Sequence, residues 1–68
     1  MQNQTPGLHM LRLPEVMKLT GLSRSTLYAL VQRGQFPRQI QLGARSVAWL
    51  SSDIEAWIAA RIAQSKQG

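Results

Sequence analysis

Residues 14–34 read PEVMKLTGLSRSTLYALVQRG and indicate two short helices joined by a tight turn. Pro14 suits the first turn of a helix, because the N–H that proline lacks would have no partner there. Gly21 supplies the backbone freedom that a helix needs in order to end and turn sharply. Ser23 can then cap the second helix through its hydroxyl. The pattern predicts a helix-turn-helix unit with helices over residues 14–20 and 23–33.

The second of these helices has two chemically different faces. Leu27, Leu30 and Val31 follow the i, i+3, i+4 spacing of a buried stripe. The opposite face is short, polar or basic, and it has no acid. A helix that enters the major groove of DNA needs such a face, because amides and hydroxyls reach base edges and cations meet phosphates. An ordinary solvent-facing helix is the alternative. The candidate DNA-binding residues of this helix are Arg24, Ser25, Thr26, Tyr28, Gln32 and Arg33.

The charge of the chain favours an acidic partner. Eight Lys and Arg residues stand against three Asp and Glu residues, which gives a net charge of +5. No acid occurs between Glu15 and Asp53, and four arginines fall within that interval. Arginine presents a planar fork that suits phosphate and guanine. The distribution of charge therefore supports nucleic-acid binding more strongly than the total does, since a basic balance alone is common to several protein classes.

The segment after Gly34 changes to a period of two. Residues 39–42 (QIQL) and 46–50 (SVAWL) alternate, and Gly43-Ala44-Arg45 lies between them as a turn of about three residues. We predict a β-hairpin over residues 39–50, which beside a helix-turn-helix is a wing. Arg45 at its tip is interpreted as a phosphate or minor-groove contact, with an ordinary solvated turn arginine as the alternative. The remaining candidate DNA-binding residues are Arg38 and Ser46.

The ends of the chain are predicted from local signals. Residues 10–13 (MLRL) alternate and can form a short edge strand. Ser52 and Glu55 have the spacing of a capping box, which predicts a last helix over 52–64. Its predicted buried face consists of Ile54, Trp57, Ile58 and Ile62. The expected organisation is a flexible tail over 1–10, one DNA-binding domain over 11–63, and a polar tail over 64–68.

Length and composition exclude several classes of protein. The 68 residues suffice for one small domain, and the absence of Cys excludes disulfides and thiolate metal sites. His9 has no second metal-binding side chain beside it, and the three acids sit at predicted helix starts. We therefore expect no enzyme, metal, cofactor or small-molecule substrate. With no bilayer-spanning run and no signal peptide, we expect a cytoplasmic, nucleoid-associated bacterial protein without a membrane partner.

Residues 13–58 together resemble the AlpA-type phage and prophage regulators, within the wider group of winged-helix excisionases and MerR-like DNA-binding domains. The similarity covers roughly residues 11–62, and its motifs are GLSRST at 21–26, GQFP at 34–37 and LGAR at 42–45. It implies a mainly α winged helix-turn-helix with three helices and a small β-hairpin. It also implies that the second helix enters the major groove while the wing touches an adjacent minor groove or backbone. Two positions depart from the family: Ala29 replaces a basic residue and Met17 a small one.

The resemblance implies a sequence-specific regulator of prophage or mobile-element genes that binds double-stranded DNA, with other copies of itself on repeated sites as a second expected partner. One alternative is a recombination directionality factor, an excisionase that bends attachment-site DNA. A further alternative is a protein-binding adaptor that presents the same helix to an acidic partner. Arginines on both the helix and the wing fit two phosphate tracks better than one protein patch.

Overall fold

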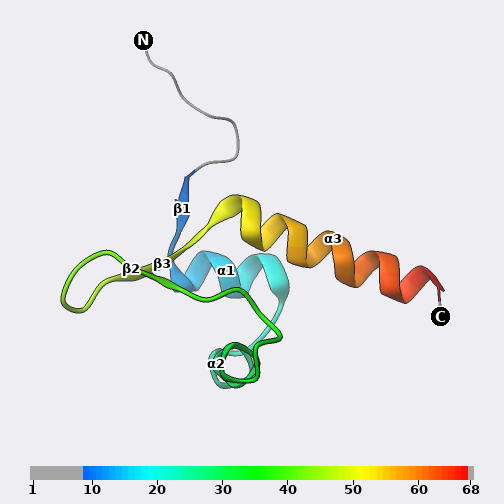
Figure 1. Cartoon of the computed structure of the whole chain (residues 1–68), viewed down its shortest axis with the longest axis horizontal. Helices are drawn as coiled ribbons and strands as arrows, with labels where there is room; N and C mark the ends of the chain where they lie inside the picture. Colours follow the sequence, from blue (N-terminus) through cyan, green and yellow to red (C-terminus); the bar gives the residue numbers. More distant parts are fainter. Residues whose placement is uncertain (1–8, 68) are drawn as a thin grey trace, which may run out of the picture.

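The computed structural model describes residues 9–67, which form a mainly helical domain with a small antiparallel sheet (Figure 1). This is the predicted winged helix-turn-helix, with three helices and a hairpin wing in the described residues. The elements in chain order are β1 (Met10–Leu11), α1 (Leu13–Thr20), α2 (Arg24–Gln32), β2 (Ile40–Gln41), β3 (Val47–Leu50) and α3 (Ser51–Gln67).

The central strand of the sheet is β3, which pairs antiparallel with both neighbours in the order β1-β3-β2. Ile40 lies opposite Ala48 in the wing, and Met10 lies opposite Leu50 on the other edge. The predicted hairpin is therefore confirmed, although its loop spans residues 42–46 and is longer than expected. The predicted edge strand near residue 10 is also present, shortened to two residues.

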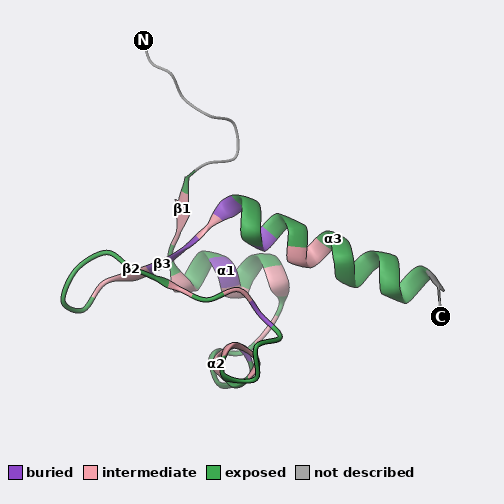
Figure 2. Ribbon diagram, viewed as in Figure 1, coloured by how far each residue is buried: buried purple, intermediate pink, exposed green. Residues whose placement is uncertain are grey.

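The core of the domain is formed by five apolar side chains from different elements. Val16, Leu27, Trp49 and Ile54 are fully buried, and Phe36 is almost so. These residues come from α1, α2, β3, α3 and the segment between α2 and the wing. Figure 2 shows the buried positions gathered where β3 meets α1 and the first turns of α3. These buried contacts attach both α2 and the wing to the same hydrophobic core.

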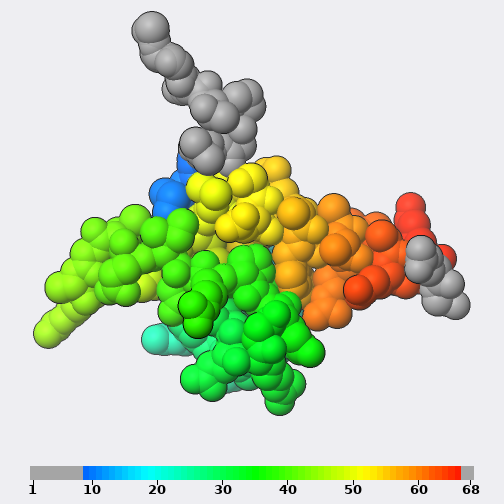
Figure 3. Space-filling view, in the orientation of Figure 1, coloured from blue at the N-terminus to red at the C-terminus, as the bar shows by residue number. Residues whose placement is uncertain are grey.

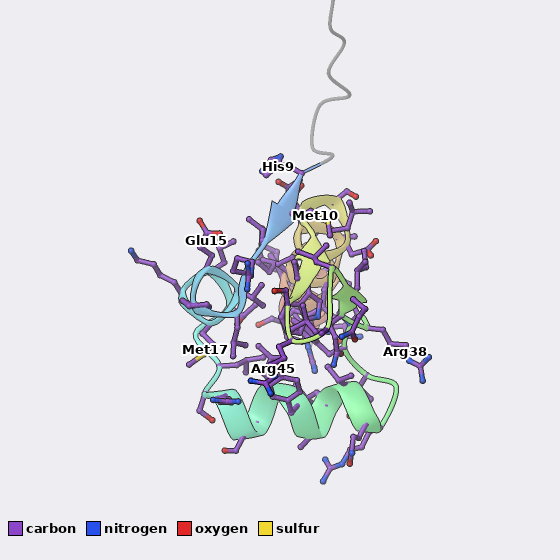
Figure 4. The ribbon with its side chains drawn as sticks, turned by 90° about the vertical axis from the view of Figure 1, so that its left-hand side faces the viewer. His9, Met10, Glu15, Met17, Arg38 and Arg45 are labelled. Carbon is purple, nitrogen blue, oxygen red and sulfur yellow. The ribbon has the colours of Figure 1, made fainter. Side chains whose placement is uncertain are left out.

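The helix-turn-helix forms through the local signals that predicted it. α1 ends at Gly21, which has a φ of 75° and donates its N–H to the Met17 carbonyl at 2.8 Å. The Ser23 hydroxyl caps α2 by accepting a hydrogen bond from the Thr26 N–H at 3.3 Å. Figure 1 shows α2 end-on while α1 runs across the view, and Figure 4 shows the reverse, so the two helices cross steeply.

Substitution of Gly21 by alanine should destabilise the domain by about 1–2 kcal/mol, because a Cβ is unfavourable in the left-handed conformation. No atom lies within 4 Å of the added Cβ, so the backbone alone causes the loss. Gly43→Ala is the matched control, since it also has open space but no positive φ. Urea denaturation of both variants measures the difference. Equal stabilities would show that the turn does not require the left-handed residue.

The last helix differs from its prediction at both ends. α3 begins at Ser51, directly after β3, so Ser52 is the second residue of the helix and not its cap. Ser51 is buried, and its N–H donates to the His9 carbonyl at 2.8 Å, which gives His9 a structural role. Tertiary hydrogen bonding, rather than a local capping box, therefore sets where α3 starts.

The far half of α3 projects beyond the core (Figures 1 and 2). Ile62, predicted as buried, is 51% exposed because no other element reaches that part of the helix within residues 9–67. Residues 64–67 continue the helix where a tail was predicted. Residues 1–8 of the predicted N-terminal tail, and residue 68, lie outside the described residues. No helix within the described part combines the length and apolar character that crossing a membrane requires.

Candidate nucleic-acid interface

The outer face of α2 is exposed along its whole length. Leu27 is fully buried, whereas Arg24, Ser25, Gln32 and the C-capping Arg33 are exposed. Because side chains opposite a buried position on a helix face outward, the core contact of Leu27 sets which residues α2 presents to a partner. Ala29 lies on the same exposed face and leaves space for close approach at its middle. The structure thus brings together most of the α2 residues that the sequence singled out.

Two of the candidate α2 residues also have structural contacts. Tyr28 is half-buried, with its ring centroid 6.2 Å from that of Trp49, and the Arg24 guanidinium lies 5.9 Å from the Tyr28 centroid. The Thr26 hydroxyl accepts a hydrogen bond from the Ser23 hydroxyl at 2.9 Å, so it contributes to the helix cap. Tyr28 therefore connects the core to the outer face and supports Arg24 there.

The wing loop has a defined shape. The Ser46 carbonyl accepts hydrogen bonds from the backbone N–H groups of Leu42 and Gly43, at 2.7 and 3.3 Å. The Gln41 side-chain amide donates to the carbonyls of Gly43 and Ala44, at 2.7 and 3.4 Å. Arg45 is exposed on this loop, and Figure 4 shows it at the wing tip that faces the viewer. The loop therefore presents Arg45 from a braced turn.

The segment between α2 and the wing is held by the two tryptophans. The Trp49 indole N–H donates to the Pro37 carbonyl at 2.9 Å, and the Trp57 indole N–H donates to the Gln35 carbonyl at 2.8 Å. The Phe36 ring packs edge-on against Trp57, with centroids 4.9 Å apart. The sequence pattern predicted Trp57 as part of a buried helix face, and it gave no sign of these hydrogen bonds from either tryptophan. In the structure they also fix how the wing is placed relative to α2.

A recess lies where the end of α2 meets the wing, which Figure 3 shows as neighbouring parts of the surface. Arg38 is exposed at this place, and Figure 4 shows it to the side of the C-terminal end of α2. Of the three glutamines that line this recess, Gln39 and Gln41 were not predicted from the sequence, because a neutral amide in an alternating segment gives no signal of its own. The lining residues are Val31, Gln32, Arg38, Gln39 and Gln41.

The exposed cations of α2 and the wing have no acidic neighbours in sequence. Arg33, Arg38 and Arg45 are exposed and form no ion pair within residues 9–66. Their charge is therefore available to a partner. Exposed guanidinium groups on a helix and on an adjacent loop suit an extended, regularly charged anion.

Comparison with known proteins assigns the family. The model of the family described as prophage CP4-57 regulatory protein (AlpA) matches residues 9–62. An uncharacterised protein of Enterobacteria phage P4, ORF88, is 59% identical over 58 residues, covering 85% of this chain and 66% of the phage protein. The DNA-binding transcriptional activator AlpA of Escherichia coli K12 is 32% identical over 65 residues, covering 87% of this chain and 93% of AlpA. This chain belongs to the AlpA family of prophage regulatory proteins.

Proposed function

We propose that this chain is a sequence-specific DNA-binding regulator of prophage or mobile-element genes. In this proposal α2 enters the major groove of double-stranded DNA and the wing loop, residues 42–46, contacts the adjacent minor groove or backbone. The observation that carries the proposal is the exposed, acid-free surface formed by α2 and the wing, with arginines on both elements. The similarity to a transcriptional activator that binds DNA supports the same function.

The geometry suits the two tasks of a DNA reader. Sequence is read by side chains that reach base edges. In this proposal Ser25 and Gln32, which are polar and exposed on α2, make those contacts. Affinity comes mainly from phosphate contacts, and exposed arginines flank that face. The segment between α2 and the wing is held by two hydrogen bonds. Little conformational entropy of this segment is therefore lost when both elements bind DNA. Copies of the chain bound side by side on repeated sites are part of this proposal.

The affinity for DNA should depend steeply on salt. If the arginines of α2 and the wing make about four phosphate contacts, the logarithm of the association constant should fall against the logarithm of salt concentration with a slope of about −3 to −4. Fluorescence anisotropy with a labelled duplex at several salt concentrations gives the slope. A flat response would contradict groove binding and favour a protein partner for the same surface.

A matched variant separates a specific surface from general charge. Lys66 lies exposed in the last turn of α3, at the end of the molecule away from the wing (Figure 1). Lys66→Gln removes one positive charge and should leave the slope unchanged, whereas Arg45→Gln should reduce its magnitude by about one.

Fragments selected from the host genome by the parent chain would then distinguish promoter control from an attachment-site role.

A further inference from the structure

The recess between the end of α2 and β2 lies between the two elements that the proposed function assigns to DNA. Gln32 lines the recess from α2, and Gln41 lines it from β2 of the wing. Arg38 and Gln39 lie on the segment that joins these two elements. Contacts of α2 with bases and of the wing tip with DNA leave this recess without a role. Its position and its lining both point to one ligand.

We infer that the recess receives the sugar–phosphate backbone of one DNA strand, with Arg38 and Gln39 as phosphate ligands. The inference rests on the proposed function. In B-form DNA, the backbone of one strand separates a major groove from the neighbouring minor groove. If α2 lies in the first groove and the wing in the second, that strand must cross the surface between them. The recess is where the surface makes room for it.

The chemistry of the lining fits a phosphate. Every polar side chain in it is an arginine or a glutamine, so each carries N–H donors, and no carboxylate lines it. Arg38 is exposed and can offer two parallel N–H groups to one phosphate. Gln39 is half-buried and lines the same recess. Val31 supplies an apolar wall that can contact the sugar.

Gln41 has a different role in the same recess. Its amide already donates to two carbonyls of the wing loop, the shorter contact being 2.7 Å to Gly43. Because its amide nitrogen already donates to the wing loop, Gln41 shapes the wall and holds the wing rather than binding the phosphate. The ligands are therefore the two residues on the joining segment, Arg38 and Gln39.

The test neutralises single phosphates. The parent chain first selects fragments of bacterial genomic DNA, and the shortest duplex that retains binding is then synthesised with one methylphosphonate at a time along each strand. Dissociation constants are measured for the parent, Arg38→Gln, Gln39→Ala and Arg45→Gln, and circular dichroism checks that each is folded. A lost charge-assisted contact should weaken binding of the parent about tenfold at the phosphate that occupies the recess.

The variants decide whether Arg38 binds that phosphate. Arg38→Gln should bind the unmodified duplex about tenfold more weakly and show no further loss at that one position. Gln39→Ala should show a smaller loss there than the parent, and Arg45→Gln should keep the full loss. If Arg38→Gln remains as sensitive as the parent at every phosphate, the backbone does not occupy the recess, although DNA binding stands. If the parent selects no DNA, the proposed function and this inference both fail.

Discussion

Replacement of Trp49 by alanine should unfold the domain. Trp49 is fully buried on the central strand, where its ring lies near Tyr28 and Phe36 and its indole N–H holds the Pro37 carbonyl. Truncating a large buried aromatic side chain costs about 3–5 kcal/mol. A domain of this size has a total stability of about the same magnitude. Circular dichroism should show the loss of helix, and thermal melting should show no cooperative transition.

Two further substitutions locate the cause of that loss. Trp49→Phe keeps a six-membered ring but removes the indole donor, so it should fold with a stability lowered by about 1–3 kcal/mol, the cost of a part-buried carbonyl left without its partner. Ile62→Ala removes an apolar side chain that is 51% exposed and should change stability by less than about 0.5 kcal/mol. A cooperative melt of Trp49→Ala close to that of the parent would contradict the central place of Trp49 in the core.

The helix-turn-helix could be predicted because its signals are local. The turn at Gly21, the cap at Ser23 and the buried spacing of Leu27 each act within a few residues, and all three are confirmed. The start of α3 could not be predicted in this way. It depends on hydrogen bonds between Ser51 and His9, which lie 42 positions apart in sequence, and no local pattern reports such a pair.

The candidate site also has some features that local sequence predicts and others that depend on long-range packing. Exposed arginines are visible in the sequence, because charge and the absence of acids need no knowledge of the fold. The recess beside Arg38 was missed, since it exists only where α2 and the wing approach each other. The same holds for the tryptophan N–H groups that bond carbonyls 12 and 22 positions away and thereby hold the segment between α2 and the wing. The sequence alone indicates which arginines are exposed, whereas the packing of the elements decides how these side chains are arranged.

Under the proposed function, Ser25→Ala and Gln32→Ala should weaken binding to the selected site by about 1–3 kcal/mol and binding to random DNA by much less. Both residues are exposed on α2, where hydroxyl and amide groups can pair with base edges, so their loss removes sequence information. Ser25 is the cleaner test, because Gln32 also lines the recess and can touch the backbone there. Binding isotherms on both DNAs measure the two effects.

Arg45→Ala should show the opposite behaviour and serves as the comparison. A contact from the wing tip to a phosphate carries little base information, so this variant should weaken both DNAs by similar factors and reduce the magnitude of the salt slope by about one. A preference of the wing for a narrow A·T-rich minor groove would add a modest dependence on the flanking sequence. If folded Arg45→Ala binds like the parent, the wing only supports the fold. If Ser25→Ala and Gln32→Ala both leave the preference for the selected site unchanged, these side chains do not read the DNA sequence, and the proposed role of α2 fails.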